Sequence, residues 1–374
     1  MLLLQQLIRI PSVNPEHTPD RPDITNEQKI AEFVADYLTD FGANVILEEI
    51  APQRPNLIAR FAPLDGRPRI LLGPHLDTVS VENMAIDPFS GEIRDGKVWG
   101  RGASDTKGPM AAMLSALKAN KNILSDLPIA VDFIAFMGEE ASQHGSKHFA
   151  AHHAKDYQFA IIGEPTSMQV VHTTKGSLWA TLSTTGVSAH ASQPHLGENA
   201  ILKLGGALVT LQENLAPVLA GYDHPVLGHS TMNIGTITGG TAPNIVPNQA
   251  SAQIDIRLTP ALHAAGGALK ILTEIIDELK LPLAIGSAHE NPPMETRVDN
   301  PYIQKLLATD SRTLPAGAPW FSDAAHLSAA GLPSICLGPG SIDQAHTKDE
   351  FIDLALLKEG EVFFSNFIQS LAKN

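Results

Sequence analysis

Short apolar runs that end at glycine or proline recur in the first half of the chain, and each is followed by His, Asp or Glu. The three clearest runs are Ile70–Leu72, Ile129–Phe136 and Phe159–Ile162. Runs of this length between turn residues are typical of buried strands. Apolar residues at helical spacing separate them and predict helices, the clearest over Thr25–Phe41 and Gly108–Ala119. Thr25 and Gln28 have the spacing of a capping box at the start of the first of these helices.

The pattern changes near residue 174. The next segments are a strand, a helix, two strands, a helix and a strand: Leu178–Val187, Glu198–Gln212, Thr231–Thr238, Ala250–Leu258, Ala261–Leu279 and Leu281–Ile285. This β-α-β-β-α-β order is the ferredoxin-like unit. The alternation of strands and helices then resumes, with a strand at Leu332–Leu337 and a closing helix near Leu354–Leu371.

The sequence therefore predicts an α/β protein in two domains. Residues 1–174 and 287–374 form a discontinuous domain on a mixed, mostly parallel sheet, and residues 175–286 form an inserted ferredoxin-like α+β domain. A chain of 374 residues is long enough for this arrangement.

Composition narrows the classes of partner. The net charge of −14 argues against nucleic acid and anionic membranes as partners, but not against a small anionic substrate. The single cysteine, Cys336, excludes an intrachain disulfide framework and suits a reducing compartment. The first residues have no basic segment typical of a secretory signal, and no apolar run approaches the ~20 residues that span a bilayer. We therefore expect a cytoplasmic protein.

Potential metal ligands follow four of the predicted strands or precede a helix: His75, Glu139, Glu140, Glu164, His346 and Asp105. The carboxyl ends of strands in an open α/β sheet build its ligand sites, so these groups can converge. Several carboxylates packed together repel one another unless a cation lies among them. Imidazole and carboxylate ligands without thiolate suit Zn²⁺, Co²⁺ or Mn²⁺. Two histidines and three carboxylates are more ligands than one tetrahedral zinc needs, whereas a pair of metals ~3.5–4 Å apart uses these five groups naturally.

Asp77 lies two residues after His75, so in an extended chain both side chains point the same way. Its carboxylate can accept a hydrogen bond from one imidazole nitrogen and leave the other for a metal. A single His-x-Asp would more simply be a capped turn with a surface histidine. The metal-site interpretation depends on the potential ligands at the other strand ends.

Six segments in order resemble the M20 metallopeptidase/deacylase family: HLDTV at 75–79, GRGASDTKG at 100–108, GEEASQHGS at 138–146, GEPT at 163–166, TGVSAHAS at 185–192 and GPGSIDQAHTKDEF at 338–351. The resemblance extends from the first helix to the last. It is closest to members similar to acetylornithine deacetylase and succinyl-diaminopimelate desuccinylase. It implies a catalytic domain that holds two divalent metal ions, most typically Zn²⁺, and an inserted lid or dimerisation domain.

The resemblance also assigns roles, position by position. The positions that match the family's metal ligands are His75, Asp105, Glu140, Glu164 and His346. Asp105 is implied as the bridging ligand, Asp77 as the aspartate that orients the first histidine, and Glu139 as the general base. A water activated by the metals would attack an amide carbonyl, and Glu139 would deliver the proton to the departing amine.

In the inserted domain, His190 matches a histidine that stabilises the oxyanion, and in dimeric members it comes from the other subunit. Arg257 matches an arginine that binds the substrate carboxylate, and Asn244 matches a substrate-binding asparagine. Two simpler alternatives stay open: His190 in a polar loop, and Arg257 paired with Asp255 on a solvent-exposed sheet. The resemblance implies a homodimer formed through this domain.

We therefore expect a metal-dependent amidohydrolase that removes an N-acyl group, chiefly acetyl, from an amino acid such as N-acetylornithine. The alternatives within the family are a succinyl-diaminopimelate desuccinylase and a small-peptide carboxypeptidase or dipeptidase. A catalytically silent relative that binds metal or ligand is the alternative of another class. A nucleotide-dependent enzyme is disfavoured because the chain has no phosphate-binding loop.

Overall fold

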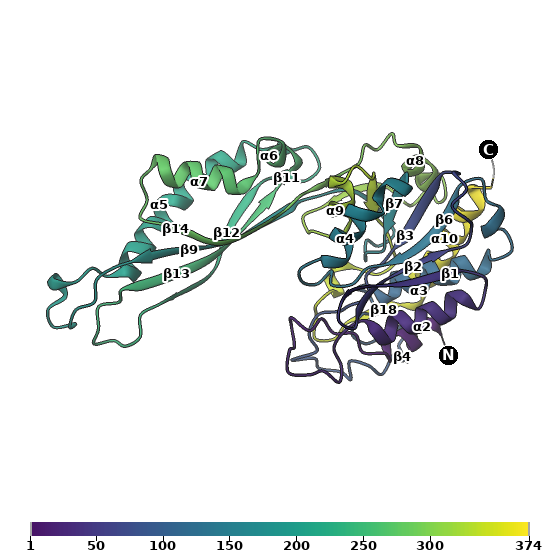
Figure 1. Cartoon of the computed structure of the whole chain (residues 1–374), viewed down its shortest axis with the longest axis horizontal. Helices are drawn as coiled ribbons and strands as arrows, with labels where there is room; N and C mark the ends of the chain where they lie inside the picture. The colour runs from purple at the N-terminus through teal and green to yellow at the C-terminus, as the bar shows by residue number, and fades with distance from the viewer. Residues whose placement is uncertain (1, 373–374) are drawn as a thin grey trace. The chain divides into compact units, whose positions relative to one another are not determined.

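The computed structural model describes residues 2–372 of the chain. The chain folds into two compact units (Figure 1). The first unit comprises Met1–His172, Glu295–Ala316 and Ser322–Asn374, and the second comprises Thr173–Met294 and Gly317–Phe321. Each unit has its own hydrophobic core. Among the described residues, no helix is both long and apolar enough to cross a bilayer.

The larger sheet has nine strands. Its order is β1 (Asn44–Ala51), β2 (Arg54–Arg60), β6 (Ala130–Ala135), β3 (Arg69–Gly73), β7 (Phe159–Ile162), β17 (Ser334–Cys336), β8 (Val170–Thr174) and β15 (Met294–Glu295), and β16 (Pro315–Ala318) pairs with β8. The central strands β6, β3, β7 and β17 are parallel, whereas β1 and β2 add to one side as antiparallel strands. This confirms the predicted mixed α/β fold.

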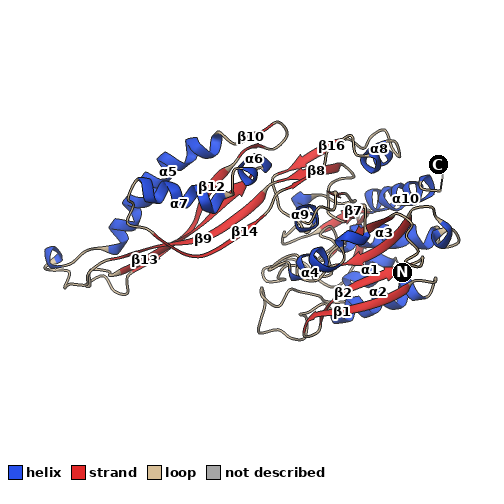
Figure 2. Ribbon diagram, turned by 45° about the horizontal axis from the view of Figure 1, so that its top comes forward, coloured by secondary structure: helices blue, strands red, loops and turns tan. Residues whose placement is uncertain are grey.

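Helices cover both faces of these strands (Figure 2). One layer contains α1 (Leu3–Ile8), α2 (Gln28–Thr39), α3 (Lys107–Ala119), α8 (Pro301–Leu307) and α10 (Leu354–Ser370). The opposite layer contains α4 (His144–His152) and α9 (Ala324–Ala329). Side chains alternate between the layers: Ile70 and Leu72 belong to the core under the first, while Phe136 meets Phe149 of α4 edge to face at 5.4 Å. A small sheet of β18 (Phe351–Asp353), β5 (Lys97–Trp99) and β4 (Glu92–Arg94) completes the unit.

The second unit is a four-stranded antiparallel sheet with helices on one face. Its order is β12 (Thr231–Gly239), β13 (Gln249–Leu258), β9 (Gly176–Thr185) and β14 (Ala284–Asn291). The helices are α5 (Ala200–Ala220), α6 (Pro260–Ala264) and α7 (Ala268–Glu278), and β10 (Asp223–His224) pairs with β11 (Gly228–His229). In chain order the elements run β-α-β-β-α-β, so the predicted ferredoxin-like architecture is confirmed.

Two local predictions are wrong. The predicted helix over Ala261–Leu279 is two helices, because Gly266 and Gly267 adopt positive φ angles of 111° and 91°. A Cβ at Gly267 would also collide with the Glu290 carboxylate, so the break requires glycine.

The capping box at Thr25 does not form either. Thr25 pairs with Val13 in an isolated β-bridge, and α2 begins only at Gln28, after the N-cap residue Glu27. Tertiary pairing therefore takes the place of the local cap.

Candidate metal centre

The ends of the parallel strands bring the predicted ligands to one edge of the sheet. Pairing of β3 with β6 continues past both strands, since Leu76 N–H donates to the carbonyl of Phe136 at 2.8 Å and Phe136 N–H to the carbonyl of Pro74 at 3.0 Å. On the other side of β3, Gly163 N–H donates to the carbonyl of Gly73 at 3.1 Å. His75, Glu139–Glu140 and Glu164 therefore leave neighbouring strands at the same edge, as the sequence predicts.

Asp105 lies between the two histidines. One of its carboxylate oxygens is 3.1 Å from Nε2 of His75, and the other is 3.5 Å from Nε2 of His346. The Glu140 carboxylate lies 3.0 Å from the same His346 nitrogen. One ligand atom each from His75, Asp105 and Glu140 lies within 4.8 Å of the others. A carboxylate that faces two imidazoles from its two oxygens is placed as a bridging ligand would be.

Two of the predicted ligands each have a buried carboxylate oxygen without a partner among the described residues, namely Oε1 of Glu140 and Oε1 of Glu164. Burial, and then the nearby charge of Asp105, raises the pKa of Glu164 well above its ordinary value. Burial likewise raises the pKa of Glu139 well above normal, and the neighbouring Glu164 adds to this effect. Unpartnered oxygens in a buried group of acids are what a cation would satisfy.

Asp77 is completely buried and organises the loop that follows β6. Its carboxylate accepts hydrogen bonds from the main-chain N–H of Glu139 at 3.0 Å and of Glu140 at 3.1 Å, and from the Asn14 amide at 2.8 Å. Nδ1 of His75 lies 2.9 Å from the main-chain carbonyl of Asp77 and 3.4 Å from its carboxylate. A donor role for Nδ1 leaves Nε2 as the ligand atom, so Asp77 orients both the histidine and the two glutamates.

The carboxylates of the candidate metal centre favour positive charge on the two histidines. Hydrogen bonds to Asp105 and then to Glu140 raise the pKa of His346 to about 10. Burial opposes a charge on His75, yet the carboxylates of Asp105 and Asp77 raise its pKa well above normal. A set of two imidazoles and three carboxylates without thiolate fits a pair of divalent ions of the zinc type.

Sequence reasoning missed one residue of the centre. Glu350 is fully buried, and its carboxylate accepts main-chain hydrogen bonds from Gly102, Ser104 and Asp105 at 2.8–3.0 Å. It also pairs with the Arg101 guanidinium at 2.8 Å. Glu350 therefore fixes the loop that carries Asp105. Its only sequence signal is its position four residues after His346, which does not by itself distinguish it from a surface acid.

The second unit places His190 and Asn244 side by side. The segments around them pair, since Ala191 N–H donates to the carbonyl of Asn244 at 3.0 Å. His190 is exposed, and its Nδ1 accepts the main-chain N–H of Ser192 at 3.1 Å. The proton of a neutral ring therefore lies on Nε2, which makes Nε2 a hydrogen-bond donor.

Arg257 forms a bidentate salt bridge with the Asp255 carboxylate, and both N–O distances are 2.9 Å. Asp255 also accepts a hydrogen bond from the Trp179 indole at 2.7 Å. This is the geometry of the simpler alternative. In the structure the arginine that the family resemblance assigns to the substrate is therefore paired with Asp255. Its role in substrate binding stays a prediction.

Comparison with known proteins identifies the family of the chain. The model of peptidase family M20/M25/M40 matches residues 71–370. The chain belongs to the M20 family. Acetylornithine deacetylase of Proteus mirabilis is 32% identical over 98% of this chain and 95% of that protein.

Solved structures show the same fold. A tripeptidase from Staphylococcus aureus superposes with a TM-score of 0.80 at 21% identity, covering 100% of this chain and 97% of that one. A Bacillus subtilis protein described as a dinuclear metal-binding M20 peptidase superposes with a TM-score of 0.70 at 13% identity, covering 99% and 97%.

This M20 chain is therefore a metal-dependent hydrolase that acts on amide bonds, as the sequence predicted. The substrates of these hydrolases are small N-acyl amino acids or peptides.

Proposed function

We propose that this enzyme removes an N-acetyl group from an amino acid, with N-acetylornithine as the leading substrate. The observation that carries the proposal is the 32% identity to an acetylornithine deacetylase over nearly the whole of both chains. The Staphylococcus aureus tripeptidase is only 21% identical and supports the fold alone. Desuccinylation and cleavage of small peptides are the alternatives for the same site.

In this proposal His75, Asp105, Glu140, Glu164 and His346 would hold two divalent ions, Zn²⁺ by preference, and Asp105, which faces both histidines, would be the shared ligand. When bound, such ions polarise the substrate carbonyl and make water easier to deprotonate. The unpartnered oxygens of Glu140 and Glu164 support this assignment. The ligand set is the one that the family resemblance implies, and the preference for zinc comes from the chemistry of the donors.

Glu139 is the proposed proton carrier. It removes a proton from the attacking water as the new C–O bond forms, and it gives that proton to the nitrogen as the C–N bond breaks. The products are acetate and the free amine. A carboxylate with a pKa raised by burial suits both steps, because it must bind the proton as well as release it. Asp77 keeps Glu139 in place through its main-chain N–H.

The second unit supplies the substrate contacts in this proposal. The donor Nε2 of His190 stabilises the developing oxyanion. Arg257 leaves Asp255 and pairs with the substrate carboxylate. Asn244, which is next to His190, also binds the substrate. Residues 1–174 and 287–374 would then be the catalytic domain, and 175–286 the lid and dimerisation domain.

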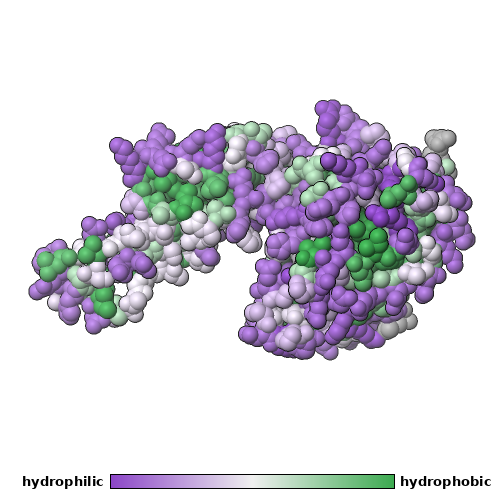
Figure 3. All heavy atoms as spheres, in the orientation of Figure 1, coloured by the Kyte–Doolittle hydropathy of each residue, from purple (hydrophilic) through white to green (hydrophobic). Residues whose placement is uncertain are grey.

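A homodimer through the second unit is part of the same proposal. Most residues of β12 are exposed at the edge of the sheet, and apolar side chains of β12 and α5 are open to solvent, including Leu202, Val209 and Ile237. Figure 3 shows apolar atoms gathered over α5 and α7. A sheet edge beside an apolar helix face is suited to pairing with a second copy.

The test is to compare kcat/KM for N-acetylornithine, other N-acetyl amino acids, N-succinyl-diaminopimelate and dipeptides, each before and after chelation and with Zn²⁺ restored. We expect the highest value for N-acetylornithine, lost on chelation and recovered with metal. Turnover of dipeptides with none of N-acetyl amino acids would replace the deacetylase proposal with the peptidase alternative.

The cytoplasmic location stays a prediction from cysteine usage, and cell fractionation tests it.

A further inference from the structure

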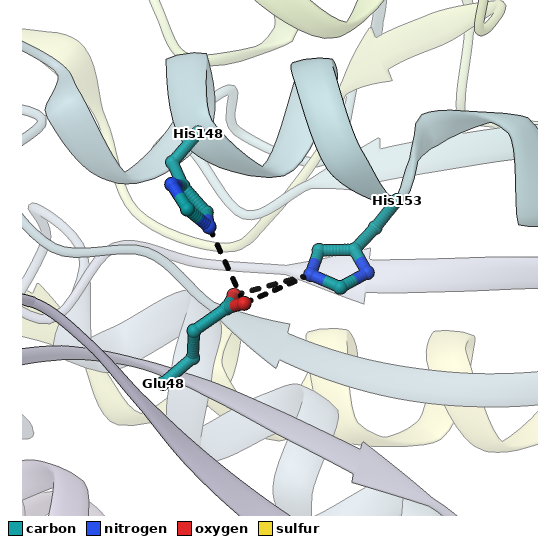
Figure 4. A group of neighbouring side chains, drawn as sticks. All are labelled: Glu48, His148 and His153. Carbon is teal, nitrogen blue, oxygen red and sulfur yellow. Dashed lines mark hydrogen bonds and ion pairs between the residues drawn. The ribbon is translucent and has the colours of Figure 1, made fainter.

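Three side chains outside the candidate metal centre converge on the face of the sheet that α4 covers. Glu48 lies on β1, His148 on α4 and His153 directly after that helix. Figure 4 shows both imidazoles pointing their Nε2 atoms at the Glu48 carboxylate. The distances are 3.3 Å from His148 and 3.2 Å from His153, and one ligand atom of each residue lies within 4.8 Å of the others.

Packing holds both rings in these orientations. The His148 ring stacks on His152 with centroids 4.1 Å apart, and the His153 ring lies 5.3 Å from the buried ring of Phe149. Nδ1 of His152 lies 2.8 Å from the carbonyl of His148, so this third histidine is tied to its own helix. The two imidazoles that face Glu48 are therefore preorganised, and His152 supports one of them without facing the carboxylate.

The spacing suits a metal better than two separate ion pairs. Neighbouring ligand atoms of a tetrahedral zinc with bonds of about 2.0–2.1 Å lie about 3.3 Å apart, and the two nitrogen–oxygen separations here are 3.3 and 3.2 Å. Charge-assisted hydrogen bonds are shorter, at about 2.7–2.9 Å. Two protonated imidazoles would also place two positive charges beside one negative charge.

The site is open enough for exchange with solvent. The side chains of Glu48, His148 and His153 are 28%, 33% and 22% exposed. Water can therefore reach the group and fill the fourth position of a tetrahedron. His148 lies on α4 and His153 directly follows it, and this helix begins four residues after Glu140. An ion here would therefore link the end of α4 to β1.

We propose that Glu48, His148 and His153 form a further binding site for a divalent transition-metal ion such as Zn²⁺, separate from the candidate metal centre. Two nitrogen ligands and one oxygen ligand favour Zn²⁺, Co²⁺ or Ni²⁺ over Mg²⁺ and Ca²⁺, which prefer oxygen. The proposal does not depend on the substrate of the enzyme.

The test is to dialyse the full-length, chelator-stripped chain against a fixed free concentration of Zn²⁺ and to measure zinc per chain by plasma mass spectrometry. The variants are the double substitution His148→Gln with His153→Gln, the single substitution Glu48→Gln, and His144→Gln, at an exposed histidine of the same helix, as the matched control. We expect the double variant to bind one ion per chain fewer than the wild type, and the control to bind the same number. For Glu48→Gln we expect at least tenfold weaker binding of that ion.

Equal zinc content in the wild type and the double variant would overturn the proposal. So would an equal loss in His144→Gln, because any histidine of this helix would then have the same effect. Circular dichroism of each variant establishes that it is folded. As a second readout, saturating Zn²⁺ should raise the thermal midpoint of the wild type more than that of the double variant. Equal increases would also contradict the site.

Discussion

The main-chain N–H of Asp105 donates a hydrogen bond of 3.0 Å to the buried carboxylate of Glu350. Asp105 faces both histidines of the candidate metal centre, so Glu350 acts on the centre through the loop that carries its central carboxylate. The same carboxylate pairs with Arg101, which leaves its charge compensated in the interior. Glu350 is therefore a positioning residue, fixed by the fold before any ion binds.

Glu350→Gln should weaken zinc binding by about 10–100-fold, as is typical when a partner behind the direct ligands is lost. The amide keeps the shape of the side chain but loses the charge that holds three N–H groups and Arg101. Competition with a coloured chelator measures the affinity. The matched control is Glu361→Gln on α10, which removes a pair with Lys358 at the surface. An unchanged zinc affinity, with only a lower thermal midpoint, would restrict Glu350 to a role in stability.

Glu139→Gln should separate metal binding from turnover. We expect full zinc content and a fall in kcat of about 10²–10⁴-fold, because the amide cannot carry the proton from water to the amine. Glu140→Gln is the informative comparison, since Glu140 contacts His346 and has an unpartnered buried oxygen. That variant should lose zinc as well as turnover. Near-normal kcat in Glu139→Gln would refute the proposed base.

His326 should make the metal-free protein sensitive to acid. Burial, and then the charge of Lys147, lowers the pKa of His326 to about 3 in the folded state. The unfolded chain therefore binds more protons between about pH 3 and pH 6.5, and stability falls as the pH drops below 6.5. This histidine alone should cost about 2 kcal/mol at pH 5.

Urea unfolding of the chelated protein at pH 7.5 and pH 5 measures this effect. His326→Gln has no group that titrates in this range, so its free energy of unfolding should fall by about 2 kcal/mol less than that of the wild type between the two pH values. The difference between pH values cancels any packing loss that the substitution causes at both. Equal falls would show that His326 is not kept neutral by the fold.

Residue patterns predicted the parts of the structure that depend on local periodicity. The strand predicted at Ile129–Phe136 appears as β6 (Ala130–Ala135), and the helix predicted at Gly108–Ala119 appears as α3, because apolar spacing indicates both their type and their position. The placement of His75, Glu140 and Glu164 at one edge was also predictable, since neighbouring parallel strands end at the same edge of the sheet.

Long-range contacts account for what the sequence did not show. The capping box at Thr25 failed because a bridge to Val13 holds that residue in the extended state. Glu350 was missed because its partners lie about 245 positions away in the chain. The pair between His148 and Glu48 was not predicted, since nothing in the sequence places Glu48 beside that histidine. Pairing between distant elements leaves no periodic signal.

The proposed homodimer makes a prediction about the edge strand β12. Ile237 is 56% exposed on this strand, and among the described residues β12 pairs only with β13. A lysine at an exposed sheet edge opposes pairing with a second copy. Ile237→Lys should therefore sediment at the chain mass of 39.9 kDa, whereas the wild type should sediment at about twice that value.

The control is Val226→Lys, which places the same charge at a 50% exposed apolar residue in the turn between β10 and β11. This variant should stay dimeric. If His190 acts on the partner's centre, the monomeric Ile237→Lys protein should also lose turnover while it keeps its zinc. A wild type that is fully active as a monomer would contradict both the dimer and a role for His190 across it.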